Sequence, residues 1–592
     1  MTASKAHRSP LSGVVEEVSV KNGQFVDKGD LLLILESMKV HVRIEAETSG
    51  TVNELNLKKA DAVNRNDVLL VLIDPQNSDQ PTPTQGSQRT ESLPHPAIET
   101  WKQRQALSLD PARSKEVQKR HTKDYATARE NLANLCDTDG FQEYGQLAVA
   151  AQRQRQDYET LKTTTAADGV ITGVAAVDGI STALIINDYS VLAGTQGYFH
   201  HQKIDRMLDV AGKQSLPVIM FTEGGGGRPG DTDVTTINSG LQCTTFATWA
   251  GLSGQVPRIT IANGYNFAGN AALFGAGDIT IATKRAWIGM AGPAMIAGGG
   301  LGTFKATDIG PIDTQSTNGV VDIVAEDEAD ACRLARKTLS LVTKKFIESW
   351  RAPAQDLLQS VMPESRRVTY DVRSILSTIA DLDSLVELQA DYGKSIITMF
   401  MRIEGRSIGV LANDCRHLGG AIDTDAGQKA SRFMQLCNDF KLPIVSFCDT
   451  PGFMVGPEHE EQAAVRRLAE LFKVGAQLTV PFYAVVLRKC YGLGAQAMLG
   501  GSTKAPLYTL AWPTGEFGPM GLEGAVTLGF KKELEAQPCE ESRNELFDKL
   551  LDEQYSKGQA IEVASVLELD AVIAPTDTRS TLSRVLKRQS NH

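Results

Sequence analysis

The sequence predicts an α/β protein in which a small all-β sandwich precedes two larger, homologous α/β domains. Three observations predict this fold class: a short repeat near the N-terminus, a following stretch almost free of apolar residues, and a long duplication over the rest of the 592 residues. Internal repeats constrain a fold strongly, because each copy must form the same unit of secondary structure.

The first repeat has an offset of 37 residues, so that Ser12–Val20 matches Ser49–Leu57. Both copies alternate apolar and polar residues, as short strands do. One copy of about 25 residues is too small to bury a core alone, so we expect both to pack as one sandwich over residues 1–75. The peptide Glu36-Ser-Met-Lys-Val40 joins the copies. We expect it at an exposed hairpin tip that holds Lys39 in solvent.

Residues 76–100 are expected to form a disordered linker. The run Asn77–His95 consists mainly of Ser, Gln, Thr and Pro and contains almost no apolar side chain. Such a segment cannot bury enough surface to offset its conformational entropy. About twenty extended residues span at most roughly 65 to 70 Å, which would let the N-terminal domain reach distant sites.

The second repeat defines the two larger domains, expected at residues 101–350 and 351–592. Residues 179–221 align without gaps with residues 405–447, at an offset of 226 and with twelve identities. Strand-like runs such as Leu216–Phe221 alternate with helix-length segments, which is typical of α/β domains. Identical pairs include Gly194 and Gly420, Lys203 and Lys429, and Arg206 and Arg432. The seam between two such domains is a common place for an active site.

Composition excludes several classes of protein. A net charge of −11 and a pI near 5.5 remove the attraction that nucleic acid or an anionic membrane needs. Eight cysteines without a C-x-x-C pair indicate neither a zinc ribbon nor a disulfide framework, and a reducing compartment fits them best. No run approaches the roughly 18 apolar residues of a membrane span, and the first ten residues lack a signal-peptide core. We therefore expect a cytoplasmic protein without nucleic-acid or membrane partners.

No metal site is expected. Glu458-His-Glu-Glu461 is the strongest candidate, but acidic residues just after a proline more often mark the first turn of a helix.

Each large domain contains an apolar strand that ends in a loop with few side chains. The loops are Phe221-Thr-Glu-Gly-Gly-Gly-Gly-Arg228 and Phe447-Cys-Asp-Thr-Pro-Gly-Phe453. Loops of this kind let a substrate approach backbone N–H groups. Small-residue elements follow at Phe267–Gly269 and Leu493–Ala495, so N–H donors could converge as an oxyanion hole in each domain. Two such sites suit a reaction in which two carbonyl oxygens gain negative charge.

Two other interpretations of the glycines are weaker. Single glycines more often only form tight turns, but their paired recurrence favours the donor interpretation. Gly225-Gly-Gly-Arg-Pro-Gly230 matches G-x-G-x-x-G, yet Pro229 interrupts the fingerprint and no acidic residue follows in Thr244–Gly254. No dinucleotide site is therefore predicted, and the chain contains no Walker motif.

Glu36-Ser-Met-Lys-Val40 resembles the attachment site of biotin carboxyl carrier domains, in which the lysine after the methionine is biotinylated. The family more often has Ala-Met-Lys-Met, so Ser37 and Val40 are mild departures. The resemblance implies covalent biotin on Lys39, attached by a biotin protein ligase. The alternatives are a lipoyl site, where Asp-Lys-Ala is usual, and an ordinary surface lysine.

Residues 111–579 resemble the carboxyltransferase subunit of acyl-CoA carboxylases, the family that contains propionyl-CoA carboxylase β chains. The stretches that carry the resemblance are Asp168-Gly-Val-Ile-Thr-Gly173, Leu418-Gly-Gly-Ala-Ile-Asp423, Asp449-Thr-Pro-Gly-Phe-Met-Val-Gly456 and Arg488-Lys-Cys-Tyr-Gly492. The family fold implies that both large domains are crotonase-like β-β-α superhelix domains, and that the small domain is a biotinyl/lipoyl-like sandwich.

The resemblance also implies the reaction: transfer of a carboxyl group from N-carboxybiotin to the α carbon of a short acyl-CoA, of the acetyl-CoA or propionyl-CoA type. The ureido and thioester oxygens both become anionic, and the cofactor itself acts as the base. By resemblance, Gly225 and Gly226 form one set of N–H donors, and Gly494 and Ala495 form the other. Which set serves biotin and which the thioester stays open.

The second donor set can be aligned with the family motif in two ways. Many family members have Tyr-Gly-Gly-Ala where this chain has Tyr491-Gly-Leu-Gly-Ala495, so Leu493 and Gly494 are an alternative donor pair. The family position that helps select the length of the acyl chain corresponds to Gln496. Glutamine is neither an acidic nor an aliphatic residue, which are the two types known at this position. The sequence therefore does not predict which acyl group the substrate carries.

The family resemblance further implies a homohexamer with sites between the first domain of one subunit and the second of another. A separate biotin carboxylase subunit is expected, because no ATP-binding carboxylase is visible in the sequence. The alternative function is a biotin-dependent acyl-CoA decarboxylase or transcarboxylase. More distant rivals are an inactive carrier that holds biotin for other enzymes and a crotonase-type hydratase or isomerase, which would keep its turnover after Lys39→Ala.

Overall fold

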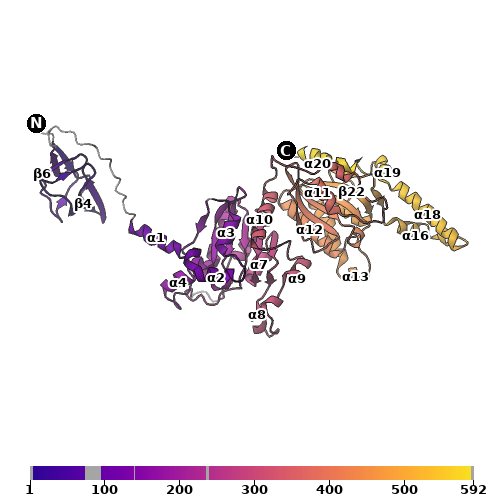
Figure 1. Ribbon diagram of the computed structural model, residues 1–592, viewed down its shortest axis with the longest axis horizontal. Helices are drawn as coiled ribbons and strands as arrows, with labels where there is room; N and C mark the ends of the chain where they lie inside the picture. The colour runs from indigo at the N-terminus through magenta and orange to yellow at the C-terminus, as the bar shows by residue number, and fades with distance from the viewer. Residues whose placement is uncertain (1–3, 74–94, 139, 235–238, 589–592) are drawn as a thin grey trace. The chain divides into compact units, whose positions relative to one another are not determined.

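The computed structural model describes residues 4–73, 95–138, 140–234 and 239–588. The chain divides into two compact units, Met1–Leu93 and Pro94–His592 (Figure 1). The first unit contains the short repeat, and the second contains both halves of the 226-residue duplication. The parts of the second unit before and after residue 350 are called the N half and the C half.

The first unit consists of two four-stranded sheets, with strand orders β1-β8-β6-β3 and β5-β4-β2-β7. Its strands are β1 (Ser4–Arg8), β2 (Gly13–Val18), β3 (Phe25–Val26), β4 (Leu31–Ser37), β5 (Val40–Glu45), β6 (Gly50–Asn53), β7 (Ala62–Val63) and β8 (Val68–Ile73). Alternate side chains point inward from both sheets, and Val15, Leu33 and Leu70 belong to the resulting core. The all-β sandwich predicted from the short repeat is confirmed.

In the N half, the strands are β9 (Gln142–Tyr144), β10 (Val170–Val177), β11 (Ile180–Asn187), β12 (Val218–Phe221), β13 (Arg258–Ala262), β14 (Tyr265–Phe267), β15 (Ile279–Thr283), β16 (Trp287–Gly289) and β17 (Ile323–Ala325). The helices are α1 (Pro96–Ala106), α2 (Ser114–His121), α3 (Ala128–Leu135), α4 (Tyr158–Thr164), α5 (Tyr198–Gln214), α6 (Thr245–Gly251), α7 (Gly269–Gly275), α8 (Pro293–Gly298), α9 (Ile312–Thr317) and α10 (Glu328–Thr343).

In the C half, the strands are β18 (Val386–Leu388), β19 (Ile396–Ile403), β20 (Arg406–Asn413), β21 (Ile444–Thr450), β22 (Phe482–Tyr491), β23 (Tyr508–Ala511), β24 (Glu516–Gly518) and β25 (Ala571–Val572). The helices are α11 (Val372–Ile379), α12 (Thr424–Asp439), α13 (Pro457–Glu460), α14 (Ala464–Gln477), α15 (Gly492–Met498), α16 (Leu522–Gly529), α17 (Lys531–Glu535), α18 (Glu540–Lys557), α19 (Ala560–Ser565) and α20 (Thr578–Arg588).

The two halves have the same sheet topology. The strand order is β9-β10-β11-β12-β13-β15-β17 in the N half and β18-β19-β20-β21-β22-β23-β25 in the C half. In each order the first two pairings are antiparallel and the remaining ones are parallel. Strands β19 and β20 begin and end 226 residues after β10 and β11. The duplication predicted from sequence is therefore a duplication of structure.

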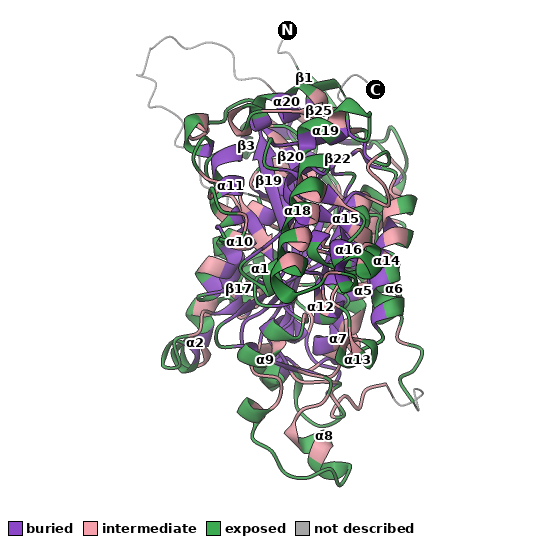
Figure 2. Cartoon of the chain, turned by 90° about the vertical axis from the view of Figure 1, so that its right-hand side faces the viewer, coloured by how far each residue is buried: buried purple, intermediate pink, exposed green. Residues whose placement is uncertain are grey.

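A continuous apolar core joins the halves. Helix α10 contacts strands of both sheets, and its buried Ala335 and Leu339 belong to the same cluster as Ile219 of the N half and Phe400 of the C half. Figure 2 shows β19 and β20 buried inside the unit and α18 with a largely exposed surface. The small-residue loops follow β12 and β21, which lie in the sheets that this core holds in place.

The first helix of the second unit begins at Pro96, five residues before the boundary predicted at residue 101. His95 caps this helix by accepting the Ala97 N–H at Nδ1, and proline is well suited to a first helical position because its φ is already helical. Residues 76–94 of the predicted linker lie outside the described residues. In the part of the chain that the structure describes, no helix is both long and apolar enough to cross a bilayer.

Candidate active site

Lys39 lies at the tip of a tight hairpin in the first unit. Ser37 of β4 pairs with Val40 of β5, so Met38 and Lys39 alone form the turn. Their φ angles of 52° and 66° are the left-handed values that a two-residue hairpin turn of type I′ requires. Both side chains are exposed, Met38 to 95%. This is the exposed hairpin tip that the sequence predicts, and it leaves the Lys39 amine accessible for covalent attachment.

The glycine loop of the N half follows β12 and is held by main-chain hydrogen bonds to a neighbouring segment. The Gln196 N–H donates to the Gly226 carbonyl at 3.0 Å, and the Arg228 N–H donates to the Gln196 carbonyl at 2.8 Å. The buried Asn270 amide adds a second restraint, because its Nδ2 donates to the Gly194 and Gly225 carbonyls at 3.0 and 2.6 Å.

The two glycines predicted as donors in this loop differ. The Gly225 N–H donates to the Ala193 carbonyl at 3.0 Å, so it holds the loop and is not free for a substrate. The Gly226 N–H has no acceptor among the described residues. Gly226 also lies close to Ala268 just before α7, since a Cβ placed on Gly226 would come within 2.8 Å of the Ala268 Cβ. Gly226 is therefore the available donor of the predicted pair.

The loop after β21 repeats this arrangement in the C half. The Ile422 N–H donates to the Gly452 carbonyl at 3.0 Å, and the Met454 N–H donates to the Ile422 carbonyl at 2.9 Å. Each of these residues lies 226 positions after its counterpart in the N half. The same two bonds therefore hold both loops, but the Gly452 N–H, unlike that of Gly226, donates to the Thr450 hydroxyl at 3.1 Å.

The N-terminal turn of α15 faces this second loop, since Gly494 lies against Gly452. The helix begins at Gly492, and the first three N–H groups of a helix have no acceptor within it. Leu493 and Gly494 are among these three, whereas the Ala495 N–H is the first that the i to i−4 pattern uses. The geometry thus favours Leu493 and Gly494, the alternative pair in the sequence, over the pair that includes Ala495.

A buried carboxylate lies at the base of each loop. Glu223 accepts two hydrogen bonds of 2.8 Å from the Arg120 guanidinium; burial raises the pKa of Glu223, and Arg120 opposes that shift. Its counterpart Asp449 accepts from Arg488 at 3.1 Å and from the Lys489 N–H at 3.0 Å. These ion pairs anchor the strand ends from which the loops start.

A cavity of about 640 Å³ adjoins the glycine loop of the N half at Glu223. Its aromatic side chains include Tyr265 and Trp287, whose rings stack at 4.9 Å, and its rim carries the exposed Lys119 and Lys123. Aromatic faces and cations together suit a ligand with a flat ring system and phosphate groups. The sequence did not reveal this cavity, because its walls come from separate segments that no motif connects.

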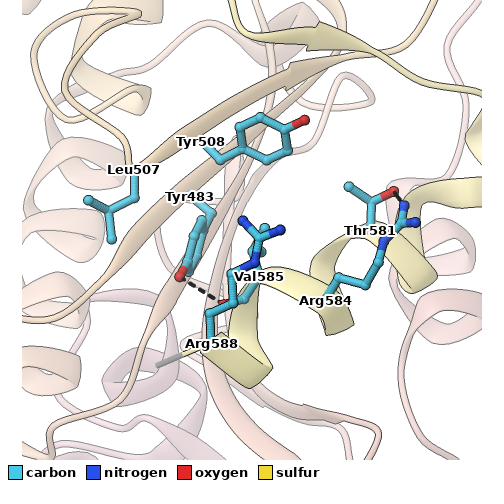
Figure 3. A pocket seen from close by; sticks show the side chains of 7 residues that line it. All are labelled: Tyr483, Leu507, Tyr508, Thr581, Arg584, Val585 and Arg588. Atoms are coloured by element: carbon cyan, nitrogen blue, oxygen red, sulfur yellow. Dashed lines mark hydrogen bonds between the residues drawn. The ribbon is translucent and has the colours of Figure 1, made fainter. Parts of the chain in front are cut away.

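A second cavity, of about 500 Å³, lies in the C half between α20 and the starts of β22 and β23 (Figure 3). The Tyr483 hydroxyl donates to the Val585 carbonyl at 3.5 Å in its wall. In a parallel sheet the starts and the ends of strands lie at opposite edges. The donor loops follow strand ends, so this cavity is not part of the candidate active site.

A buried thiol in the second loop and the acidic run Glu458–Glu461 are structural features. The Cys448 thiol is buried beside Cys490, and the neighbouring thiol together with burial raises its pKa well above the usual range, which makes it unreactive. Residues Pro457–Glu460 form α13, as the helix interpretation of this acidic run predicts. Among the described residues, no group of three or more His, Cys, Asp or Glu side chains could hold a metal ion.

Two family models match the chain. The carboxyl transferase domain matches residues 119–591, and the model described as biotin-requiring enzyme matches residues 5–72. The methylmalonyl-CoA carboxyltransferase 12S subunit of Propionibacterium freudenreichii subsp. shermanii is 30% identical over 485 residues, which cover 80% of this chain and 90% of that protein.

Two solved structures are similar over most of the chain. A single-chain, multi-domain long-chain acyl-CoA carboxylase has a TM-score of 0.79 and 44% identity, with 98% of this chain and 56% of that one covered, so this chain spans little more than half of that protein. The transcarboxylase 12S hexamer with methylmalonyl-CoA bound has a TM-score of 0.75 and 28% identity, covering 86% and 97%. The predicted fold, two crotonase-like halves and a biotinyl-type sandwich, is confirmed.

Proposed function

The chain belongs to the carboxyl transferase domain family, and from this membership we propose that it moves a carboxyl group from N-carboxybiotin to the α carbon of an acyl-CoA. The N-terminal unit matches the biotin-requiring family, in which biotin is attached covalently to a lysine. Lys39 fits this role because it is exposed on a two-residue turn. Biotin bound there would supply the carboxyl group and a base for the α proton.

The observation that carries the proposal is a close contact between the loop and the start of the following helix that occurs in both halves. Gly226 lies against the Ala268 side chain in the N half, and the residues 226 positions later, Gly452 and Gly494, lie against each other through the Gly452 backbone in the C half. Each contact includes a residue with an available N–H, Gly226 in one half and Gly494 in the other. Two donor sites suit a reaction in which a thioester oxygen and a ureido oxygen both become anionic.

The first donor site would serve the thioester. Support comes from the 640 Å³ cavity, which adjoins the loop of Gly226 and combines aromatic rings with the exposed cations Lys119 and Lys123. These features match the adenine ring and the phosphate groups of coenzyme A. The site at Gly494 would then stabilise the oxygen of the biotin ring.

A short acyl-CoA is the first candidate substrate. A relative named for methylmalonyl-CoA transfer aligns with 80% of this chain at 30% identity. A long-chain acyl-CoA is the second candidate, because the long-chain carboxylase structure is 44% identical and covers 98% of this chain. A biotin carboxylase would charge the biotin with ATP and bicarbonate, and we propose that it is a separate subunit.

The test is a reconstituted assay. The biotinylated chain is mixed with a biotin carboxylase, ATP and ¹⁴C-bicarbonate, and acid-stable label is measured with acetyl-CoA, propionyl-CoA and palmitoyl-CoA. We expect incorporation with at least one thioester and none after Lys39→Ala. Label that is absent with every thioester, or that survives Lys39→Ala, would overturn the proposal. The decarboxylase or transcarboxylase alternative predicts instead that malonyl-CoA or methylmalonyl-CoA donates its carboxyl group faster than the forward reaction runs.

A further inference from the structure

The stretch Gly224–Gly226 of the glycine loop is held at almost every backbone group. Gly224 is bonded at its N–H and at its carbonyl to residues of β14, at 2.7 and 3.0 Å. Both backbone groups of Gly225 and the carbonyl of Gly226 also have partners. Within this stretch, the Gly226 N–H is the one backbone group without a partner among the described residues.

This N–H belongs to the peptide group that joins Gly225 to Gly226. In a planar trans peptide the C=O and N–H bonds point in opposite directions. The partner that holds the Gly225 carbonyl therefore also sets the direction in which the Gly226 N–H points. That partner is the side chain of Asn270 in the first turn of α7, whose Nδ2 donates to the Gly225 carbonyl at 2.6 Å.

The Asn270 amide is itself held in one orientation. The side chain is completely buried, and its Oδ1 accepts from the Asn187 Nδ2 at 3.0 Å and from the Gln196 Nε2 at 2.8 Å. Its Nδ2 donates to the Gly194 carbonyl at 3.0 Å as well as to Gly225. Exchanging Oδ1 and Nδ2 would place the oxygen against two carbonyls and the nitrogen against two amide donors, so only the observed orientation satisfies all four contacts.

The N half needs this restraint because glycine lies on both sides of the peptide. Glycine has the widest choice of backbone angles, so a half-turn of this peptide meets little steric resistance. In the C half, the residue 226 positions after Gly225 is Pro451, whose ring fixes φ. The counterpart of Asn270 is Gln496, which is exposed. The buried amide is therefore particular to the all-glycine loop.

We propose that Asn270 is a positioning residue, which keeps the Gly226 N–H turned toward the substrate oxygen by holding the Gly225 carbonyl. The inference rests on the proposed function, because it takes Gly226 as a donor of the carboxyl-transfer site. Asn270 would act through the peptide and not on the substrate. Without its amide, the peptide can turn over and present the Gly225 carbonyl, which repels the developing negative charge that an N–H stabilises.

Asn270→Asp tests this role through the pH dependence of turnover. A protonated carboxyl group can donate to the Gly225 carbonyl as the amide does, whereas an ionised one can only accept and favours the turned peptide. With biotin carboxylase in excess, kcat at pH 8.5 should fall by about 10² to 10³, with KM for acyl-CoA little changed. The ratio of the variant kcat to the wild-type kcat should then rise as the pH is lowered to 6.

This rise would report the new carboxyl group. All four partners of the Asn270 amide are uncharged, and the charged residues on the segments around it, Asp188, Glu223 and Arg228, are each paired with an opposite charge and are present in both proteins. Asn131→Asp is the matched control, because Asn131 is a buried asparagine of α3 that makes no hydrogen bond with the glycine loop among the described residues. Its ratio should not change with pH.

Wild-type kcat in Asn270→Asp, or a ratio that is the same at pH 8.5 and pH 6, would overturn the proposal. A merely structural role predicts such a constant ratio. If Asn270→Asp does not fold, Gln196→Leu decides, since it removes one of the two donors that orient the Asn270 amide. It should lower kcat severalfold at unchanged KM, and an unchanged kcat would contradict the role of Asn270.

Crystal structures distinguish failure of this inference from failure of the proposed function. The Gly225 carbonyl should face Asn270 in the wild type and should turn away from that position in Asn270→Asp at pH 8.5. An unturned peptide would overturn the inference even if the wild type transfers carboxyl groups. A turned peptide in a protein whose wild type transfers none would contradict the proposed function and still support the restraint.

Discussion

Gly494 lies directly against Gly452, so that a Cβ placed on Gly494 would come within 2.6 Å of the Gly452 carbonyl carbon. The first residue lies in the opening turn of α15, and the second belongs to the loop after β21. Only a glycine lets the helix approach the loop this closely. The equivalent pair of the N half, Gly226 and Ala268, differs, because there the residue at the helix start carries a methyl group and the glycine of the loop lies against it.

Replacing Gly494 with alanine should therefore lower turnover strongly. The added methyl group forces α15 away from the loop, and the loss of one oxyanion donor costs about 10² to 10³ in kcat. We expect kcat for carboxyl transfer to fall by roughly two orders of magnitude, with little change in KM for acyl-CoA. Gly524→Ala is the control, because Gly524 has no atom within 4 Å of its Cβ position. Wild-type kcat in Gly494→Ala would contradict this role.

Lys39→Arg should abolish biotin incorporation without disturbing the hairpin. The substitution keeps the positive charge at the exposed tip, and the turn depends on backbone φ angles that other residues such as Met38 also adopt. A streptavidin gel-shift on protein produced together with a biotin protein ligase measures the modification. We expect a complete shift for the wild type and none for the variant. A remaining shift would place the biotin on another lysine.

Removing the rim cations of the large cavity should weaken acyl-CoA binding. Lys119 and Lys123 are exposed and line the cavity, and exposed charges contribute about 0.2 to 1 kcal/mol each. The double alanine variant should raise KM for acyl-CoA by about 2- to 30-fold at low salt, with kcat unchanged. The difference should shrink at high ionic strength. Lys115→Ala on the same helix is the control, and an equal KM for the two variants would argue against a coenzyme A site here.

The buried Lys203 should make stability depend on pH. Burial lowers its pKa from 10.5 to about 7, and its Nζ donates to the Ala167 and Val170 carbonyls. Between about pH 7 and pH 10 the unfolded chain holds a proton on this amine that the folded chain has released, so the free energy of unfolding rises with pH. This contribution is fully present above about pH 10 and is lost as the pH falls from there to about 7.

The measurement compares urea unfolding of the wild type, Lys203→Met and Lys213→Met at pH 7 and pH 9. Other lysines titrate in this range, so the informative quantity is the difference between variants. The gain in stability from pH 7 to pH 9 should be smaller in Lys203→Met than in the wild type. Lys213→Met, which changes an exposed lysine of the same helix, should keep the wild-type gain. Equal gains in all three proteins would show that Lys203 stays charged in the fold.

The sequence by itself determined the architecture. Constant offsets of 37 and 226 residues predicted the sandwich and the doubled sheet, because a repeated pattern of strands and helices must fold the same way twice. The place of Lys39 followed from the same reasoning, since a peptide between two half-repeats becomes a hairpin tip. The two small-residue loops were also visible as motifs.

Only the tertiary structure decided which backbone groups are available. Gly225 and Gly226 look alike in sequence, yet the N–H of Gly225 is taken by Ala193 and that of Gly226 is not. The position at which α15 begins places Gly494 in its first turn, where N–H groups have no acceptor within the helix. The reason is that a donor is free or engaged according to its neighbours in space, and those neighbours come from segments far apart in the chain.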